Sequence, residues 1–246
     1  MEYIHNTEQF QFHNTVVALG KFDGMHKGHQ LIFDELLKYK EMGYQAAVFS
    51  FDRPPLNMLK HKHMSVIYTT NEKTKLLAKR GIDIYIEHPF TDEFSHLSPE
   101  DFVIKVLLEK TGMKVLVVGD DCGFGYKRQG NVELLERMSK EYDFKLIVIP
   151  KLELEGEIVS STRVRRLLSE GRVEEANRLM EDPFMICGPV VHGNHMGAEV
   201  LQMPTANQIP AEDKLLPPNG VYVSRIRYKD EVYYGISNVG VKPTIE

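Results

Sequence analysis

The stretch VVALGKFDGMHKGHQLIFDELLKY, residues 16–39, predicts both the fold of the chain and the position of its functional site. It starts within an apolar run over 15–20 that ends in glycine, which is typical of a buried strand. Apolar residues then recur at helical spacing, which predicts a helix over 28–42. His26 and His29 therefore stand where a strand passes into a helix.

Four more apolar runs are short and bounded by glycine, proline or charge, which favours buried strands. These runs cover 45–51, 83–88, 114–119 and 145–150, and helical patterns between them cover 71–80, 99–111 and 131–142. Strands that alternate with helices predict a parallel sheet with helices on both faces. Sheets of this kind bind ligands at the carboxyl ends of their strands.

The pattern changes near residue 183. From there on, β-like runs are separated by glycine, proline and charge, with no helical pattern between them. We therefore predict an α/β domain over residues 1–182, followed by a small antiparallel β unit over residues 183–246.

Composition excludes several classes of protein. The net charge of −5 argues against nucleic acid as a partner, because such proteins usually carry a broad basic surface. The sequence has neither an apolar run long enough to span a membrane nor a readable secretory signal. Cys122 and Cys187 lie far apart and form no metal-binding spacing, which favours a reducing cytoplasm. Composition leaves the oligomeric state open.

The His-x-Gly-His motif at residues 26–29 predicts a phosphate site. At the start of a helix, backbone N–H groups and the helix dipole favour an anion. Gly20, Gly24 and Gly28 allow a tight turn and the close approach of a ligand to the backbone. We expect the two imidazoles to stabilise charge on phosphate oxygens rather than to act as nucleophiles.

A second helix start, in IVSSTRVRRLL (158–168), is a candidate for the other end of a triphosphate. Ser161, Thr162 and Arg165 offer hydroxyls and a guanidinium suited to phosphate oxygens. This signal is weak alone and becomes strong beside His-x-Gly-His. Arg163 and Arg166 are equally consistent with an ordinary solvated basic face.

A third element, VGDDCGFGYKRQGN (118–131), follows the fourth predicted strand and so belongs to the same edge of the sheet. Asp121 in this stretch is a candidate for contact with a ribose, or with a phosphate through water or metal. The alternative interpretation is a glycine-rich turn with solvated basic residues.

These stretches resemble the bacterial FAD synthetase family, the two-domain riboflavin kinase/FMN adenylyltransferases. LGKFDGMHKGHQ, FSFDRPP, YTTNEKTKLLAKRGID, VGDDCGFGYKRQG and VSSTRVRRLL match that family's motifs in order over residues 15–180. The resemblance implies a Rossmann-like nucleotidyltransferase that joins the adenylyl group of ATP to FMN with Mg²⁺. The products would be FAD and pyrophosphate.

The resemblance also implies roles for individual residues. The catalytic group would be His26, His29 and Arg165, and the nucleotide would be bound by Gly20, Phe22, Asp23, Gly24, Gly28, Asp121, Ser161 and Thr162. The flavin would be bound by Phe51, Asp52, Pro54 and Phe124. Cys122 departs from the family, which usually has phenylalanine there.

The second unit resembles the riboflavin kinase part of the family more weakly, through GPVVHGNHMGAEVLQMPTANQ at 188–208. Thr205 and Asn207 would serve its metal–ATP site. Ala198 and Gln202 replace the family's usual arginine and glycine, and the segment with the family's catalytic glutamate would lie beyond the last residue. The sequence therefore predicts an incomplete kinase-like barrel without kinase activity.

Two alternatives remain open at this point. The chain could transfer a nucleotide to another phosphorylated acceptor, because His-x-Gly-His specifies phosphate handling and not the acceptor. It could also be a non-catalytic flavin-binding or regulatory protein.

Overall fold

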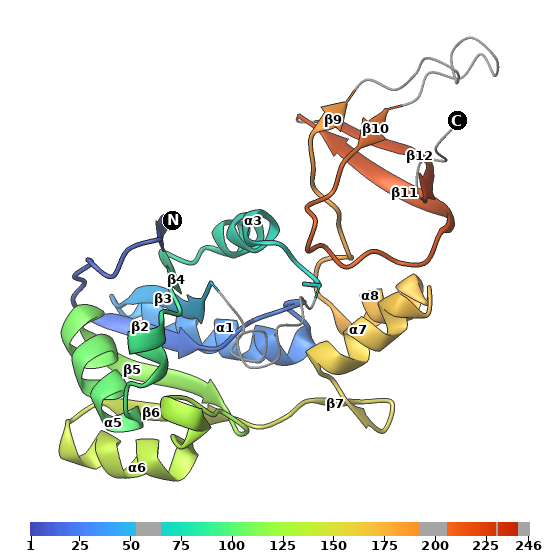
Figure 1. The fold of residues 1–246 in the computed structure, drawn as a ribbon. Helices are drawn as coiled ribbons and strands as arrows, with labels where there is room; N and C mark the ends of the chain where they lie inside the picture. Colours follow the sequence, from blue (N-terminus) through green and yellow to red (C-terminus); the bar gives the residue numbers. More distant parts are fainter. Residues whose placement is uncertain (53–64, 192–205, 230, 241–246) are drawn as a thin grey trace, which may run out of the picture.

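A six-stranded parallel sheet forms the centre of the larger unit (Figure 1). The structure is a computed structural model, and it describes residues 1–52, 65–191, 206–229 and 231–240. The strand order is β1-β4-β3-β2-β5-β6. The strands are β1 (Glu2–His5), β2 (Thr15–Leu19), β3 (Gln45–Phe51), β4 (Ile84–His88), β5 (Met113–Gly119) and β6 (Lys145–Ile149).

Five of these strands confirm the predicted runs, and the edge strand β1 was not predicted. β1 pairs in parallel with β4, and the Tyr3 hydroxyl donates a hydrogen bond to Glu87 Oε2 at 2.7 Å. The strand has only four residues, with an exposed residue at each end and two half-buried residues between them. Such a short stretch carries little periodicity, so its pairing with β4, 82 residues further along the chain, could not be read from the sequence.

Helices cover both faces of the sheet, as predicted. They are α1 (Lys27–Glu41), α3 (Thr70–Arg80), α4 (Asp92–Ser95), α5 (Pro99–Asp101), the π-helix η1 (Phe102–Lys110), the 3₁₀ turn η2 (Tyr126–Arg128), α6 (Val132–Glu141), α7 (Ser161–Ser169) and α8 (Val173–Leu179). In Figure 1, α1 and α3 lie on one side of the strands, and α5 and α6 lie on the other.

The strands divide their side chains between two apolar cores. Val16 and Ala18 of β2 belong to the core under α1, which includes Phe33. Val17 belongs to the opposite core, together with Leu135 of α6. This alternation follows from the two-residue period of a strand, and burial on both faces explains why β2 is apolar throughout.

The antiparallel pairs follow the parallel sheet in the chain. They are the hairpin of β7 (Glu153–Leu154) with β8 (Glu157–Ile158), then β9 (Val190–Val191) with β10 (Asn207–Gln208), and β11 (Gly220–Tyr228) with β12 (Glu231–Val239). The antiparallel character predicted after residue 183 is confirmed. Figure 1 shows β9–β12 standing apart from the parallel sheet, beyond α7 and α8.

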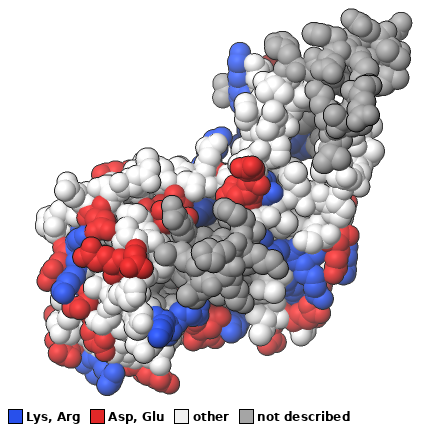
Figure 2. Space-filling model, viewed as in Figure 1, with Lys and Arg blue, Asp and Glu red and all other residues white. Residues whose placement is uncertain are grey.

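Charge on the surface is mixed in sign. Figure 2 shows lysine and arginine interleaved with aspartate and glutamate over the visible face of the larger unit, with no broad basic area. Within the described ranges, none of the helices is both long and apolar enough to cross a membrane.

Candidate functional site

His26, His29 and Asp121 of the predicted phosphate site follow the carboxyl ends of β2 and β5, which are neighbouring strands. From β2 the chain proceeds to β3 on one side of the sheet, and β5 lies on the other side. A parallel sheet opens a crevice at such a reversal of strand order. The loop over residues 20–28, here called the motif loop, leaves β2 at this point and leads into α1.

The motif loop has a strained backbone that packing holds in place. Phe22 and Met25 have φ of 49° and 37°, a left-handed conformation that is unfavourable for large side chains. The Phe22 ring is 2% exposed and lies against the rings of His29 and Phe33, with centroids 5.2 and 5.1 Å away. A Cβ atom at Gly20 would come within 2.9 Å of the Phe22 ring, so only glycine fits there.

The two histidines of the motif stack on each other at the start of α1. Their ring centroids are 3.6 Å apart and their planes differ by 18°. His26 is the residue before the first turn of α1, so both rings lie beside the free N–H groups of the helix. A Cβ atom at Gly28 would lie 3.2 Å from His26 Nδ1, which explains why the motif has glycine between the histidines.

Burial keeps both imidazoles neutral. It lowers the pKa of His26 to about 4, against an ordinary value near 6.5. The pKa of His29 is held well below that value, first by burial and then by the neighbouring His26 ring. Nδ1 of each ring is buried without a hydrogen-bond partner among the described residues. A polyanion beside the rings would favour their charged forms and raise both pKa values.

The start of α7 lies directly against the motif loop. The Ser161 hydroxyl donates to the Asp23 carbonyl oxygen at 2.6 Å. Arg165 Nη2 donates to the Asp23 carboxylate at 2.5 Å, and its Nη1 donates to the carbonyl oxygen of Ser65. The structure therefore brings together the two stretches that the sequence placed at opposite ends of one triphosphate.

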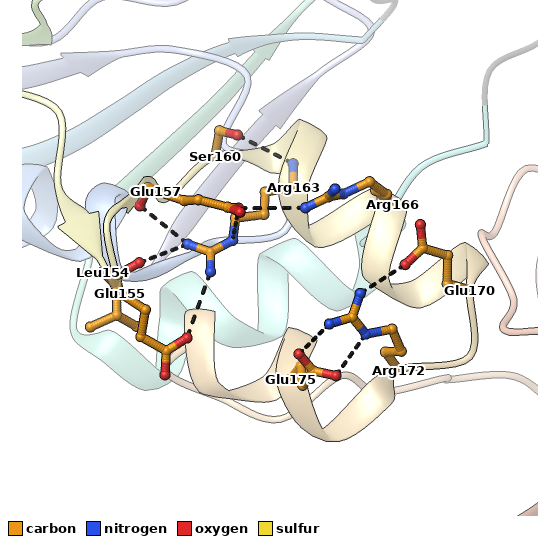
Figure 3. Close-up of polar contacts among 9 residues, drawn as sticks. All are labelled: Leu154, Glu155, Glu157, Ser160, Arg163, Arg166, Glu170, Arg172 and Glu175. Carbon is orange, nitrogen blue, oxygen red and sulfur yellow. Dashed lines mark hydrogen bonds and ion pairs between the residues drawn. The ribbon is translucent and has the colours of Figure 1, made fainter.

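Other residues of α7 contact the hairpin of β7 and β8 (Figure 3). Arg163 donates to the Leu154 carbonyl oxygen at 3.0 Å and pairs with Glu157 at 3.0 Å, and Arg166 pairs with Glu157 at 3.4 Å. Thr162 is exposed and lines an open groove with this β7–β8 hairpin. The two arginines thus anchor the hairpin, and Thr162 does not join Ser161 at Asp23.

Asp121 follows β5 at the same edge of the sheet. Its side chain is 71% exposed and its carboxylate pairs with Lys151 at 3.2 Å. The negative charge of Asp121 also acts to raise the pKa of His26, but burial of the imidazole has the larger, opposite effect. The described residues contain no cluster of three His, Cys, Asp or Glu side chains that could enclose a metal ion. An exposed carboxylate suits Mg²⁺ that arrives with a nucleotide, because this ion keeps waters and binds phosphates.

Cys122, the departure from the family, packs beside the core under α6. Burial raises the pKa of its thiol to about 12, so it remains a neutral thiol and acts as a packing group.

The predicted flavin-side residues fall at the ends of β3 and β5. Phe51 belongs to a group of rings and packs against Phe94 and Phe102, at centroid distances of 5.6 and 6.3 Å. Asp52 Oδ1 accepts a hydrogen bond from the Phe90 backbone N–H at 2.8 Å. Phe124 is 4% exposed, so its ring is part of the core under α6.

The remaining predicted residues belong to other parts of the chain. Pro54 and Thr205 lie outside the described residues. Asn207 is exposed in β10.

Sequence reasoning missed the segment that holds Asp23. The backbone N–H groups of Ile67 and Tyr68 donate to Asp23 Oδ1 at 2.9 and 3.3 Å. The only sequence signal nearby is the capping box that Thr69 and Glu72 form at the start of α3. That signal predicts a helix start and says nothing of the contact with Asp23.

A doubly covered parallel sheet with stacked histidines at its reversal point, joined to a serine and an arginine from a second helix, defines a nucleotidyltransferase. The FAD synthetase family model matches residues 8–163, and the riboflavin kinase model matches residues 180–246. The chain belongs to the FAD synthetase family.

Relatives named bifunctional riboflavin kinase/FMN adenylyltransferase match nearly the whole chain. The protein of Buchnera aphidicola subsp. Schizaphis graminum is 37% identical over 98% of this chain and 78% of its own length. That of Listeria monocytogenes is 34% identical over 99% and 79%, and that of Escherichia coli K12 is 31% identical over 98% and 78%.

Solved structures with the fold of this chain include one from Streptococcus pneumoniae. A Streptococcus pneumoniae protein named macrolide-efflux protein matches with a TM-score of 0.84 and 30% identity. The match covers 97% of this chain and 78% of that one.

Proposed function

We propose that this chain is an FMN adenylyltransferase, which converts ATP and FMN into FAD and pyrophosphate. The observation that carries the proposal is the joining of two phosphate-binding elements at Asp23. Ser161 binds its carbonyl oxygen and Arg165 binds its carboxylate, in the motif loop that leads to the two histidines at the start of α1. One triphosphate can therefore contact the histidines at its α-phosphate and α7 at its far end.

In the proposed reaction the protein supplies position and charge stabilisation. An FMN phosphate oxygen attacks the α-phosphorus of ATP in line with the departing pyrophosphate, so no protein nucleophile is required. His26 and His29 donate N–H groups to the α-phosphate oxygens and stabilise the charge that develops there. Ser161 and Arg165 hold the β- and γ-phosphates, and Thr162, which lies on the hairpin side of α7, does not take part in this contact.

The motif loop and the loop after β5 complete the nucleotide site. Gly20, Phe22, Gly24 and Gly28 keep the backbone close to the phosphates. Asp121 is the carboxylate that would hold Mg²⁺ bound to those phosphates, and the ion would neutralise part of their charge.

We propose that the flavin lies beside the ends of β3 and β5. Phe51, Asp52 and Pro54 would contact it there, and Phe124 would support the wall behind it. The exposed carboxylate of Asp52 and the half-buried ring of Phe51 are suited to a ring system with a polar edge.

We also propose that the second unit does not phosphorylate riboflavin, although both family domains are present. Ala198 and Gln202 stand where the family has arginine and a ligand-approaching glycine. The site through Thr205 and Asn207 would then bind metal–ATP weakly or not at all. The two free cysteines, Cys122 and Cys187, support a reducing compartment such as the cytoplasm.

Incubation of the purified chain with FMN, ATP and Mg²⁺, followed by chromatography of the flavins, tests the proposal. We expect FAD and an equal amount of pyrophosphate. Pyrophosphate release only in the presence of another phosphorylated compound, with FMN unused, would identify a different acceptor. Bound flavin without pyrophosphate release would identify a non-catalytic binder. A parallel incubation with riboflavin should yield no FMN.

A further inference from the structure

The segment over residues 65–69 connects the motif loop to the second unit. On one side, its backbone N–H groups at Ile67 and Tyr68 hold the Asp23 carboxylate, and the Ser65 carbonyl oxygen accepts from Arg165. The residues that fix the proposed triphosphate site thus depend on where this segment lies.

On its other side, the segment pairs with residues 213–215. The Val66 N–H donates to the Asp213 carbonyl oxygen at 2.7 Å, and the Leu215 N–H donates to the Val66 carbonyl oxygen at 2.8 Å. Between these two bonds, Lys214 turns its side chain inward. Its Nζ donates to the Ile67 carbonyl oxygen at 2.5 Å and to Glu72 Oε2 at 2.7 Å.

The Lys214–Glu72 pair has no exposure to solvent on either side chain. Glu72 also accepts from the backbone N–H groups of Thr69 and Cys187, at 2.9 and 2.7 Å. The Lys214 ammonium lies 4.4 Å from the centroid of the Phe184 ring. The charges are therefore fully partnered, and one pair ties α3 and segment 65–69 to two stretches of the chain, residues 181–187 and 213–215, here called the linker.

A buried ion pair of this kind defines geometry more than it adds stability. The loss of solvation on burial offsets much of the attraction between the charges, and apolar replacements of a whole pair are often neutral. Burial lowers the pKa of Lys214, in line with a loss of solvation for its charged form. The hydrogen bond to the Ile67 carbonyl oxygen, by contrast, orients the Ile67–Tyr68 peptide, whose own N–H is one of the two that hold Asp23.

We propose that Lys214 of the second unit is a positioning residue for adenylyl transfer in the first unit. It fixes segment 65–69, which in turn orients Asp23 and Arg165 toward the triphosphate. Lys214 itself touches no substrate. The inference rests on the proposed adenylyltransferase function and adds that the second unit serves the first unit's reaction, whether or not it has a reaction of its own.

The test compares Lys214→Met with the double variant Glu72→Gln/Lys214→Met in steady-state FAD synthesis. Lys214→Met leaves the Glu72 charge buried and unpaired, so it lowers the thermal midpoint, and the double variant restores much of that loss. For both proteins we expect kcat/KM for ATP to fall by roughly tenfold, with KM for FMN changed less than about twofold.

Glu181→Gln is the matched control. Glu181 forms another ion pair between the linker and α3, with Arg80, and among the described residues no hydrogen bond or ion pair joins its side chain to segment 65–69 or to Asp23. We expect this variant to synthesise FAD at the wild-type rate.

Three results would overturn the positioning role. The first is wild-type kinetics in a folded Lys214→Met variant. The second is a double variant whose activity recovers together with its thermal midpoint. An equal loss in Glu181→Gln would show that any weakening of the linker has the same effect. Absence of FAD from the wild-type protein would instead reject the proposed function itself.

Discussion

Strand β2 and strand β11 differ strongly in how far their apolar side chains are buried. Val16, Val17 and Ala18 of β2 are completely buried between two cores. Val223 of β11 is 90% exposed, and Ile236 of its partner β12 is 76% exposed. The first unit has helices on both faces of its sheet, whereas the described part of the second unit leaves apolar side chains of its longest hairpin uncovered.

The difference matters for function because a catalytic constellation needs a rigid support. The motif loop leaves a strand that is packed on both faces, and its strained Phe22 is held by surrounding rings. Asn207 of the second unit is exposed on a two-residue strand. Of the two activities named for the relatives, adenylyl transfer is therefore the one whose proposed site is supported by a packed core.

The largest expected effect is a loss of unfolding free energy at acidic pH. Because burial lowers the pKa of His26 to about 4, the folded protein binds its proton less readily than the unfolded chain does. Its contribution to stability is complete above pH 6.5 and is lost as the pH falls toward 4. His26→Asn should therefore lose roughly 3 kcal/mol less unfolding free energy than wild type between pH 7 and pH 4. Denaturant titrations at both pH values measure this, and equal losses would contradict it.

Parallel substitutions in β2 and β11 test the contrast in packing. Val17→Thr places a hydroxyl without a partner in a completely buried position, so it should lower the unfolding free energy by about 2 kcal/mol. Val223→Thr, on the exposed strand, should change it by less than about 0.5 kcal/mol. Urea unfolding of the two variants provides the comparison. Similar losses at the two positions would mean that β11 is covered in solution.

Removal of the second histidine tests the chemistry of the motif loop. His29→Ala should lower kcat for FAD formation by roughly tenfold or more, which is about 1.4 kcal/mol of barrier, because one donor to the α-phosphate is lost. His13→Ala is the matched control, since His13 is exposed at the amino end of β2, far from the site. Turnover of His29→Ala at the wild-type rate would refute the assigned role.

The smallest expected effect concerns the glycine of the motif. In Gly28→Ala the new Cβ would lie 3.2 Å from His26 Nδ1, so the ring must shift by a few tenths of an ångström. We expect kcat to fall roughly three- to fivefold, less than about 1 kcal/mol of barrier. Gly235→Ala in β12, where the nearest atom would be 3.4 Å away, should leave kcat unchanged. A fully active Gly28→Ala protein would show that the stacked geometry of the rings is not required.

Local patterns predicted most of the first unit. Apolar runs and helical spacing identified β2 to β6 and the longer helices between them, because burial on both faces leaves a strong periodic signal, but they did not identify the short α4 and η2. The four-residue β1 has too few buried positions for such a signal. Phe124 shows a different limit, because an aromatic residue near a site can equally pack in the core, and here its ring is 4% exposed.

The chemistry of the residues indicated which side chains suit a phosphate, but not which segment of the chain holds them in place. His26, His29, Ser161 and Arg165 could be selected because their chemistry suits phosphate. The contact from Lys214 to segment 65–69 joins residues 147 positions apart. Lysine is almost never fully buried unless paired, so the sequence alone could not indicate that Lys214 lies inside.

Isotope labelling of ATP is the most direct test of whether the adenylyl group, with its α-phosphorus, is transferred to the flavin. The purified chain would be incubated with FMN and Mg²⁺ in two parallel reactions, one with ATP labelled at the α-phosphate and one with ATP labelled at the γ-phosphate. We expect labelled FAD from the α-labelled ATP only. Label from the γ-phosphate, or no labelled flavin from either, would contradict this expectation.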